Sequence, residues 1–433
     1  MTPAARLSAA IEVFADIEAR RRPAADALKD WGLSHRFAGS GDRAGIAGLV
    51  YDALRRKASS AWLMGEATAR AVLIGMLRRE RGLATADIAA LCSGARFAPA
   101  PLTEAETAAL DAGTLDAAPA QVQGDYPDWL DPYLTRVFGD ERAAEGGALA
   151  SRAPLDLRVN TLATTREAML PRLSHLGAAA ARWSPEGLRI HLAADAKSPA
   201  IHAEPTYLKG QIEIQDEGSQ LAALLSGATP GEQVVDLCAG AGGKTLALAA
   251  AMDNHGQIYA TDTDKRRLAA IHERIARADA RNIQVRTPRG DADVLADLAG
   301  RADLVLIDAP CTGTGTWRRN PDAKWRIRPG SLAERLKEQA AALERAAGLV
   351  KPGGRIAYIT CSVLNEENGG QVRAFAAGHP DFSVEKPGEV AKALGERAYL
   401  FSRAVLISDD GLLMTPRRTD TDGFFVGLLR RSA

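Results

Sequence analysis

The chain has 433 residues, which is enough for two or three domains that each bury a core. Its apolar fraction of 46% is ordinary for a globular protein, and its 54 basic residues balance 54 acidic ones, so overall charge does not attract it to nucleic acid or to anionic lipid. The four cysteines have no C-x-x-C spacing, and no apolar run is long enough to cross a bilayer. We therefore expect a cytoplasmic protein without a disulfide framework, a metal or a membrane partner.

Residues 1–125 are predicted to form a helical domain that ends in a linker. Apolar residues recur at steps of three and four in "LSAAIEVFADIEA" and "RAGIAGLVYDALRRK", which is the spacing of one helix face. The stretch 96–129 has the prolines and glycines of a linker around one short helix. No β-type alternation interrupts this region, so the domain is expected to be all-helical.

Residues 126–205 are predicted to form a small α/β module. "PLDLRVNTL" and "EGLRIHL" have the composition of strands, and "TTREAMLPRLSHLG" between them has helical spacing.

Residues 206–433 alternate between strands and helices. The predicted strands are "EQVVDL", "GQIYATD", "NIQVRT", "ADLVLIDAP" and "GRIAYITC". Between them, helices are predicted in "KTLALAAAM", "DKRRLAAIHERIARA" and "SLAERLKEQAAALERAAGLV", the last with Ser331 and Glu334 at capping-box spacing. Near-continuous apolar strands that alternate with helices indicate a parallel sheet covered on both faces, and "LLMTPRRTDTDGFFVGLLRR" predicts two further antiparallel strands at its edge.

A glycine-rich loop, "VVDLCAGAGGKT", follows the first of these strands. It is not a phosphate loop, because Cys238 stands where glycine is needed six positions before Lys244, and its glycines do not form G-x-G-x-x-G. Asp262 lies 26 residues after Asp236, at the end of the next strand, where an acid typically binds a ribose. Nucleoside binding without a pyrophosphate cradle points to S-adenosylmethionine, and a plain strand–turn–helix corner is the alternative.

An acid and two thiols follow the next strands of the predicted sheet. Asp308 and Cys311 belong to "DAPC", and Cys361 follows "AYIT" directly. A single cysteine after a buried strand is usually a small packing residue. Two thiols beside an acid instead suit the methylation of carbon 5 of a pyrimidine, in which a thiolate adds to carbon 6 and a carboxyl group supports the charge shift at the N3 edge. Such an enzyme must take the base out of its stack.

Three motifs together, "DLCAGAGGKT", "DAPCTGTG" with "RRNPDAKW", and "ITCSVLNEEN", resemble the Sun/Nop family of RNA cytosine-5 methyltransferases, and within it the RsmB type that acts on 16S ribosomal RNA. "LRVNTL" resembles the entry to the small RRM-like module of this family, and "GDRAGIAGLVYDALRRKASSAWLMG" resembles its NusB-like RNA-binding domain. The resemblance implies an α/β fold: a helical NusB-like domain over residues 1–125, an RRM-like module over 126–205, and a Rossmann-like methyltransferase domain over 206–433.

The resemblance also implies roles for individual residues. Cys361 would be the nucleophile, Cys311 would assist release of the methylated base, and Asp308 would bind the cytosine edge and border the methyl donor. Family members carry proline in the glycine loop ("APGGK"), where this chain has Gly240 and Ala241. The residues expected to hold S-adenosylmethionine are Cys238, Ala239, Gly240, Ala241, Gly242, Gly243, Lys244, Asp262 and Asp291, with Asp308 at their border and Asp293 as the alternative to Asp291.

The segment "WRRNPDAKWRIR" (317–328) concentrates positive charge beside two tryptophans. Basic residues can bind phosphates and aromatic rings can stack on bases, so RNA contact is predicted here, with a solvated, partly packed loop as the alternative. Its basic residues are Arg318, Arg319, Lys324, Arg326 and Arg328.

The sequence thus predicts an S-adenosylmethionine-dependent RNA cytosine-5 methyltransferase whose partner is RNA, most naturally 16S ribosomal RNA. Transfer RNA is the alternative substrate. A DNA cytosine-5 methyltransferase is disfavoured by the second thiol and by the N-terminal modules. A non-catalytic RNA-binding factor for ribosome assembly remains the non-enzymatic alternative. The sequence does not predict the oligomeric state.

Overall fold

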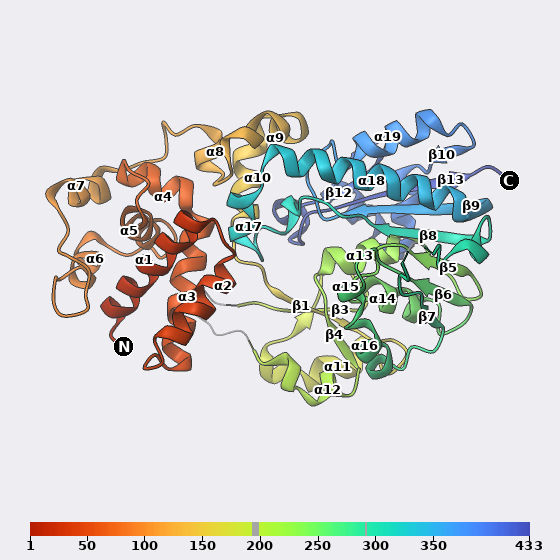
Figure 1. Cartoon of the computed structure of the whole chain (residues 1–433), viewed down its shortest axis with the longest axis horizontal. Coiled ribbons are helices and arrows are strands. Elements are labelled where there is room, and N and C mark those ends of the chain that lie inside the picture. The colour runs from red at the N-terminus through yellow and green to blue at the C-terminus, as the bar shows by residue number, and fades with distance from the viewer. Residues whose placement is uncertain (193–198, 291) are drawn as a thin grey trace. The chain divides into compact units, whose positions relative to one another are not determined.

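The computed structural model describes residues 1–192, 199–290 and 292–433 and divides into two compact units. Among the described residues, the first unit comprises 1–152 and 317–328, and the second comprises 153–192, 199–290, 292–316 and 329–433 (Figure 1). The first unit therefore takes in a short segment from the middle of residues 206–433. No helix in the described part of the chain is long and apolar enough to cross a membrane.

The first unit is helical, as the sequence predicts. Its central helix, α5, is buried on all sides from Ala71 to Leu77, so the longest apolar run of the N-terminal region forms the middle of its core. Threonine caps begin several helices, and Thr103 forms a capping box with Glu106. The α-helices are α1 (Pro3–Arg20), α2 (Ala24–Ser34), α3 (Ser40–Arg55), α4 (Lys57–Met64), α5 (Ala69–Arg79), α6 (Thr85–Leu91), α7 (Glu104–Ala112), α8 (Ala120–Gln123), α9 (Asp131–Phe138), α10 (Arg142–Leu149) and α17 (Pro321–Arg326).

The second unit begins with a small antiparallel sheet in the order β2-β3-β1-β4. The predicted strands are confirmed as β1 (Leu155–Val159) and β3 (Gly187–Ile190), with α11 (Arg166–Arg172) between them. Two further strands, β2 (Ala179–Ala180) and β4 (Ile212–Ile214), were not predicted from the sequence. Since β4 pairs with β1 and lies beyond residue 205, the small sheet extends past the expected boundary of this module. The short helix α12 (Pro205–Leu208) precedes β4.

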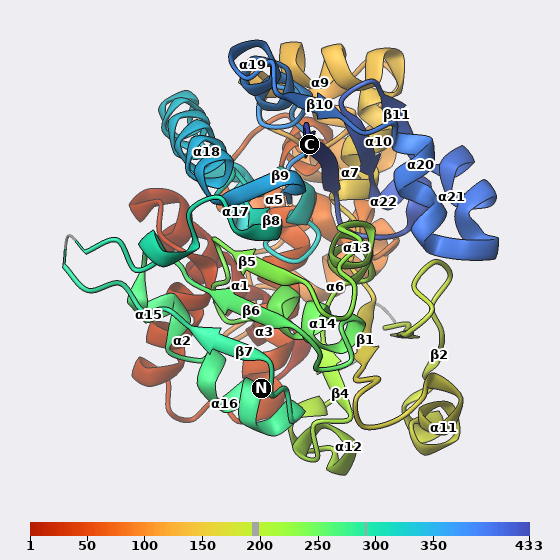
Figure 2. The ribbon, with the colours of Figure 1, turned by 90° about the vertical axis from the view of Figure 1, so that its right-hand side faces the viewer.

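The large sheet has a parallel part in the order β9-β8-β5-β6-β7. Figure 2 shows β8, β5, β6 and β7 side by side in that order. These strands are β5 (Gln233–Asp236), β6 (Gln257–Ala260), β7 (Ile283–Val285), β8 (Ala302–Asp308) and β9 (Val350–Thr360). The helices that join or precede them are α13 (Glu217–Leu225), α14 (Gly243–Ala251), α15 (Lys265–Leu268), α16 (Ile271–Ala278) and α18 (Pro329–Leu349).

The C-terminal region adds antiparallel strands beside β9, as predicted. β13 (Phe424–Arg431) pairs with β9, followed by β12 (Gly411–Met414) and β11 (Leu406–Ser408), while β10 (Phe382–Val384) pairs with the end of β13. A short helix, α22 (Pro416–Thr419), lies between β12 and β13 in the chain. The remaining helices are α19 (Gly369–Gly378), α20 (Pro387–Ala391) and α21 (Ala398–Ala404).

Two local predictions for the helices differ from the structure. The helix expected over 264–278 is interrupted at Ala269 and Ala270, which separate α15 from α16. The helix α18 begins at Pro329, so Ser331 lies inside its first turn and does not act as the N-cap.

Candidate active site

The ends of parallel strands bring most of the predicted site residues to one edge of the large sheet. Asp236 ends β5, Asp262 follows β6, Asp308 ends β8 and Cys361 follows β9. Because β8 lies between β5 and β9, the strand end with Asp308 has the glycine loop on one side and Cys361 on the other. This is the edge of an open α/β sheet at which ligands usually bind.

The glycine loop turns tightly from β5 into α14. Gly242 has a φ of +84°, and a Cβ at this position would clash with the side chain of Ile271. The N–H of Gly242 donates to the carbonyl of Ala239 at 2.8 Å, and the N–H of Leu246 donates back to the carbonyl of Gly242 at 2.9 Å. The loop therefore places the first turn of α14, with Lys244, directly above the strand end.

Asp236 is fully buried at the start of this loop. The hydroxyl of Thr245 donates to Asp236 Oδ2 at 2.7 Å, whereas Oδ1 is buried without a well-formed hydrogen bond in the described part of the chain. Burial raises the pKa of Asp236 to about 7, against the lowering effects of Thr245 and of the charge on Lys244. Besides its contact with the backbone of Cys238, which lowers the pKa of Asp236, this buried oxygen can accept a hydrogen bond from a bound ligand.

Lys244 and Asp308 form an ion pair at the centre of the site. Lys244 Nζ lies 2.6 Å from Asp308 Oδ2 and 4.9 Å from the centre of the Phe424 ring. The Lys244 side chain is only 6% exposed, whereas that of Asp308 is 34% exposed. The Lys244 ammonium group is thus buried, and the Asp308 carboxylate is the group of the pair that solvent or a ligand can contact.

The two predicted thiols lie in contact. Cys311 Sγ and Cys361 Sγ are 3.2 Å apart, and both side chains are partly buried. The hydrogen bond to Cys361 is the largest of the effects that raise the pKa of Cys311 well above its ordinary value, and burial and the charge of Glu367 act in the same direction. Cys311 therefore holds its proton more tightly than an ordinary thiol does.

Cys238 does not belong to this thiol pair. Burial raises its pKa well above the ordinary value, and the carboxylates of Asp236, Asp308 and Asp262 raise it further. Cys238 is therefore a neutral thiol that packs in the glycine loop.

A buried carboxylate, Glu367, holds the loop that carries Cys311. Its Oε1 accepts hydrogen bonds from the backbone N–H of Thr312 at 2.8 Å and from Gln339 Nε2 at 3.1 Å, and its Oε2 accepts from the Thr312 hydroxyl. Gln339 also donates to the carbonyl of Pro310 at 2.9 Å. The position of Cys311 therefore depends on two side chains from α18 and from the turn before α19.

A second set of hydrogen bonds joins the loops after β8 and β9. The N–H of Gly315 donates to the carbonyl of Cys361 at 2.9 Å, and the hydroxyls of Thr314 and Ser362 lie 2.9 Å apart. The N–H of Val363 donates to Thr314 Oγ1 at 2.9 Å. These bonds fix the two thiol-bearing loops relative to each other.

The chain is similar to methyltransferases of small-subunit ribosomal RNA. Residues 223–430 match the family model of the 16S rRNA methyltransferase RsmB/F, and residues 126–197 match the ferredoxin-like domain of RsmF/B-like methyltransferases. The chain is 32% identical to the probable ribosomal RNA small subunit methyltransferase B of Synechocystis sp. over 313 residues, which cover 72% of this chain and 68% of that protein. The chain belongs to the RsmB/F methyltransferase family.

Other known proteins agree with this membership of the RsmB/F family. The ribosomal RNA small subunit methyltransferase B of Sodalis glossinidius is 33% identical over 317 residues, which cover 72% of this chain and 66% of that protein. The crystal structure of the protein PH0851 superposes with a TM-score of 0.71 at 25% identity, covering 100% of this chain and 99% of that one. The matches to the curated relatives thus span about two thirds of their length. S-adenosylmethionine, which the sequence predicts, is the methyl donor of this family.

The expected RsmB/F donor site is described only in part. Asp262 is 3% exposed, and its Oδ2 accepts from the N–H of Gly240 at 3.0 Å, while its Oδ1 accepts from the N–H of Asp264 at 3.0 Å. Asp291 lies outside the described residues. Its alternative, Asp293, pairs with Arg345. In the described part of the chain, no group of His, Cys, Asp and Glu side chains is arranged to hold a metal.

The predicted RNA contacts of Arg318 and Lys324 need correction. Arg318 is 1% exposed and Lys324 is 0% exposed, so neither can reach a phosphate. Both belong to the helical unit, in which Lys324 Nζ donates to the carbonyl of Arg55 at 3.0 Å. Arg319 is partly buried, and Arg326 is exposed and pairs with Asp322 at 2.9 Å.

This segment packs into the helical unit because it caps two helices. The last carbonyls of a helix have no donors within it, and those of Leu54 and Arg55 in α3 accept from Trp325 Nε1 at 2.7 Å and from Lys324. At the other end, Asp322 accepts from the N–H of Ala24, the first residue of α2, at 3.2 Å. The density of charge in this segment predicted an exposed, RNA-binding surface. In the structure, Asp322, Lys324 and Trp325 instead form hydrogen bonds with backbone groups at the ends of α2 and α3.

Three neighbours of the candidate site residues were not predicted from the sequence. Glu367 lies in "ITCSVLNEEN", and an acid six residues after the thiol was a signal that could have been used. Gln339 is one polar residue in a long amphipathic helix, and Phe424 lies in the C-terminal strand far from the other motifs, so neither has a local signal.

Proposed function

We propose that this protein is an RNA cytosine-5 methyltransferase that acts on 16S ribosomal RNA. The observation that carries the proposal is the contact between Cys311 and Cys361, whose sulfurs lie 3.2 Å apart after the adjacent strands β8 and β9. Asp308, which ends β8 and pairs with Lys244, precedes Cys311 by three residues. Membership of the RsmB/F family supports the ribosomal RNA substrate.

The proposed reaction begins with Cys361. Its thiolate adds to carbon 6 of a cytosine that has left its stack, and the electron pair of the 5,6 double bond moves so that carbon 5 becomes enamine-like. Asp308 contacts the N3 edge of the base, where transfer of a proton from its carboxyl group to N3 would balance the shifted charge, and Lys244 would stabilise the carboxylate that results. S-adenosylmethionine, when bound, supplies the methyl group that carbon 5 accepts.

The second half of the proposed reaction needs Cys311. The proton on carbon 5 leaves to a water molecule, the electron pair of that bond re-forms the 5,6 double bond, and the bond between carbon 6 and the Cys361 sulfur breaks, with its electron pair going to the sulfur. Because the raised pKa keeps Cys311 protonated and the two sulfurs lie 3.2 Å apart, Cys311 can protonate the departing Cys361 sulfur. In this assignment Cys361 attacks and Cys311 allows release.

The residues at the end of β5 fit a bound methyl donor. The backbone of residues 238–243 turns closely over the strand end, and Asp236 Oδ1 is a buried acceptor without a well-formed hydrogen bond in the described residues. Asp262 would hold the ribose hydroxyls with its buried carboxylate. We place Asp291 in the same site from the family resemblance.

Methyl transfer and base mapping test the proposal. The full chain, incubated with tritium-labelled S-adenosylmethionine and deproteinised small-subunit ribosomal RNA, is expected to yield 5-methylcytosine in that RNA. Transfer RNA in a parallel reaction tests the alternative substrate. Label in transfer RNA alone would replace the substrate, and RNA binding without any methyl transfer would favour the non-catalytic assembly factor.

A further inference from the structure

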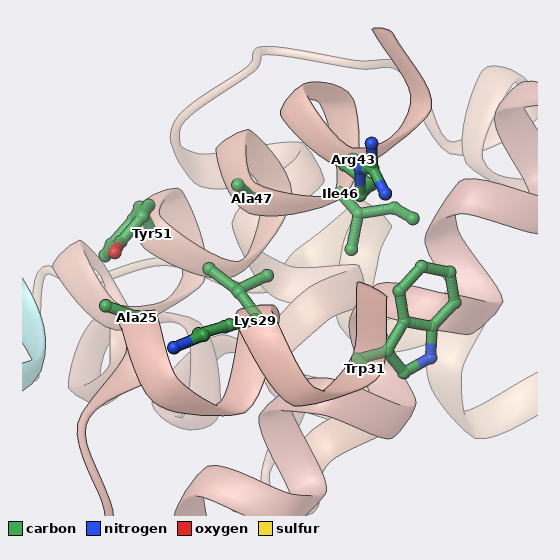
Figure 3. A pocket seen from close by; sticks show the side chains of 8 residues that line it. Ala25, Lys29, Trp31, Arg43, Ile46, Ala47 and Tyr51 are labelled. Atoms are coloured by element: carbon green, nitrogen blue, oxygen red, sulfur yellow. The ribbon is translucent and has the colours of Figure 1, made fainter. Parts of the chain in front are cut away.

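The helical unit has a cavity between α2 and α3 that the proposed reaction does not use (Figure 3). Its volume is about 330 Å³. Leu28, Ile46 and Ala47 give it apolar walls, and Figure 3 shows Tyr51 towards one end and Trp31 towards the other. A site of this size, mostly apolar with a few polar groups, is typical of small-ligand binding.

The sequence keeps this cavity open with small residues and a fixed wall. Ala25 on α2 and Ala47 on α3 both line it. Trp31 is held in place, because its Nε1 donates to Glu12 Oε2 at 3.2 Å and its ring stacks on His35 with centres 4.3 Å apart. A Cβ at Gly32 would lie 3.0 Å from Arg43 Cδ, so glycine leaves room for the Arg43 side chain to cross α2.

Lys29 and Arg43 line the cavity, and both are exposed. Within the described chain neither forms an ion pair, because the neighbouring acids have other partners. Asp30 pairs with Arg22, Asp42 with Arg6 and the N-terminus, and Asp52 with Arg81. The remaining acid of these two helices is Asp26, in the first turn of α2, and it does not line the cavity, so both charged side chains that do line it are basic. The cavity therefore combines an apolar interior with excess positive charge at its mouth.

A flat aromatic group that carries an adjacent anion fits both properties. A nucleotide of single-stranded RNA is such a group, because its base can enter an apolar, aromatic-lined site while its phosphates meet lysine and arginine. Beyond Trp31 and His35, the ring of Phe37 is 74% exposed and lies 5.7 Å from that of His35, next to the exposed Arg36. This provides a surface on which a neighbouring base can stack.

We propose that the α2–α3 cavity binds one unstacked nucleotide of the RNA substrate, with Lys29 and Arg43 on its phosphates. The proposal rests on the RNA substrate of the proposed function. It assigns to the helical unit a base-binding subsite separate from the catalytic residues, and it predicts that filling the cavity weakens RNA binding without changing the chemical step.

Two kinds of variant test the subsite. Ala47→Phe fills the cavity, and Ala44→Phe on the exposed side of the same helix is its control. The double variant Lys29→Gln/Arg43→Gln removes the charges, and Arg78→Gln/Arg79→Gln on the exposed end of α5 removes equal charge elsewhere in the unit. The charge variants are on the surface, so they test the proposal even if Ala47→Phe fails to fold.

The measurements use the full chain and a fluorescein-labelled single-stranded RNA of about 15 nucleotides. Both cavity variants are expected to bind this RNA about tenfold more weakly than their controls, with a higher KM for ribosomal RNA and an unchanged kcat at saturation. The slope of log K for RNA binding against log salt concentration should also become less steep by about 1.4 in the double variant. Each of the two lost phosphate contacts to a single strand contributes about 0.7 to this slope. RNA with 4-thiouridine should crosslink to the peptide that contains Tyr51 in the wild type and not in Ala47→Phe.

Equal RNA affinity, salt dependence and crosslinking in the variants and their controls would show that the α2–α3 cavity does not bind RNA. A side chain of a protein partner would then be the better candidate to occupy the cavity. A wild-type chain that binds RNA in this cavity but transfers no methyl group would instead contradict the proposed function. The binding and methyl-transfer measurements therefore separate the two failures.

Discussion

Cys311 Sγ lies 3.2 Å from Cys361 Sγ, although 50 residues separate the two cysteines in the chain. The contact forms because β8 and β9 are parallel neighbours, so the residues that follow them meet at one edge of the sheet. This contact and burial raise the pKa of Cys311 well above its ordinary value. The geometry thus brings a protonated thiol against Cys361 in the free protein.

The proposed roles of the two thiols predict opposite effects of their substitution. Cys361→Ala should lower methyl transfer by on the order of 10³-fold or more, since no group is left to add to carbon 6. Cys311→Ala should instead accumulate a covalent protein–RNA complex, since Cys361 still attacks but is not released. Denaturing electrophoresis with radiolabelled RNA measures both outcomes.

Cys92→Ala is the matched control for these variants, because Cys92 is a buried thiol of the helical unit outside the site. It should leave the turnover number unchanged and give no complex. A stable adduct in Cys361→Ala and none in Cys311→Ala would reverse the two roles.

Glu367 is expected to act on Cys311 by its charge as well as by its hydrogen bonds. Glu367→Gln keeps an oxygen that can accept from Thr312 but removes the negative charge that raises the pKa of Cys311. In a Cys361→Ala background, iodoacetamide should therefore alkylate Cys311 faster at pH 8 when Glu367→Gln is added, by about three- to tenfold. Mass spectrometry of the Cys311 peptide gives the rate, and an equal or slower rate in Glu367→Gln would assign Glu367 a purely structural role.

Asp308 is expected to be needed for chemistry and not only to balance Lys244. Asp308→Asn should lower kcat by about 10²-fold or more, because the carboxylate that supports the charge shift is lost. It should also lower Tm, because Lys244 is left buried without its partner. Adding Lys244→Met should restore Tm but not kcat, whereas recovery of both would mean that Asp308 acts only through the ion pair. Asp297→Asn, at an exposed acid, is the control.

The sequence predicted those parts of the fold that local patterns determine. The strands β5, β6, β8 and β9 are apolar runs bounded by glycine or acid, and the site residues at their ends follow from the parallel arrangement alone. The pattern of the sequence is therefore sufficient to place Asp308, Cys311 and Cys361 together.

The features that the sequence did not predict depend on contacts between distant segments. β4 has three residues and is a strand only because β1, more than 50 residues earlier, offers a partner. Glu367 and Gln339 are site residues because they reach the same loop from different elements. Lys324 lies in a basic, tryptophan-containing segment of the kind that binds nucleic acid, and only the packing of the fold shows that its side chain is buried.

Lys324 predicts a dependence of stability on pH. Burial lowers its pKa to about 7 in the folded chain from an ordinary value of 10.5, although the charge of Asp125 opposes this effect. Between these two values the unfolded chain binds one more proton than the folded chain, so the free energy of unfolding should rise with pH from about 7 to about 10. Lys324→Met lacks this contribution and should lose stability relative to the wild type across that window, by a few kcal/mol (~1.4 kcal/mol for each pH unit at most).

Thermal unfolding of the full chain between pH 6.5 and 9.5 measures this difference. Lys29→Met, at an exposed lysine of the same unit, is the control and should stay parallel to the wild type. The other charged groups that act on Lys324, namely Asp125, Arg55, Arg56 and Lys57, are present in all three proteins, so the comparison isolates Lys324. A constant offset between wild type and Lys324→Met over this range would mean that Lys324 stays charged in the fold, and that its hydrogen bond to Arg55 is strong enough to offset the cost of burial.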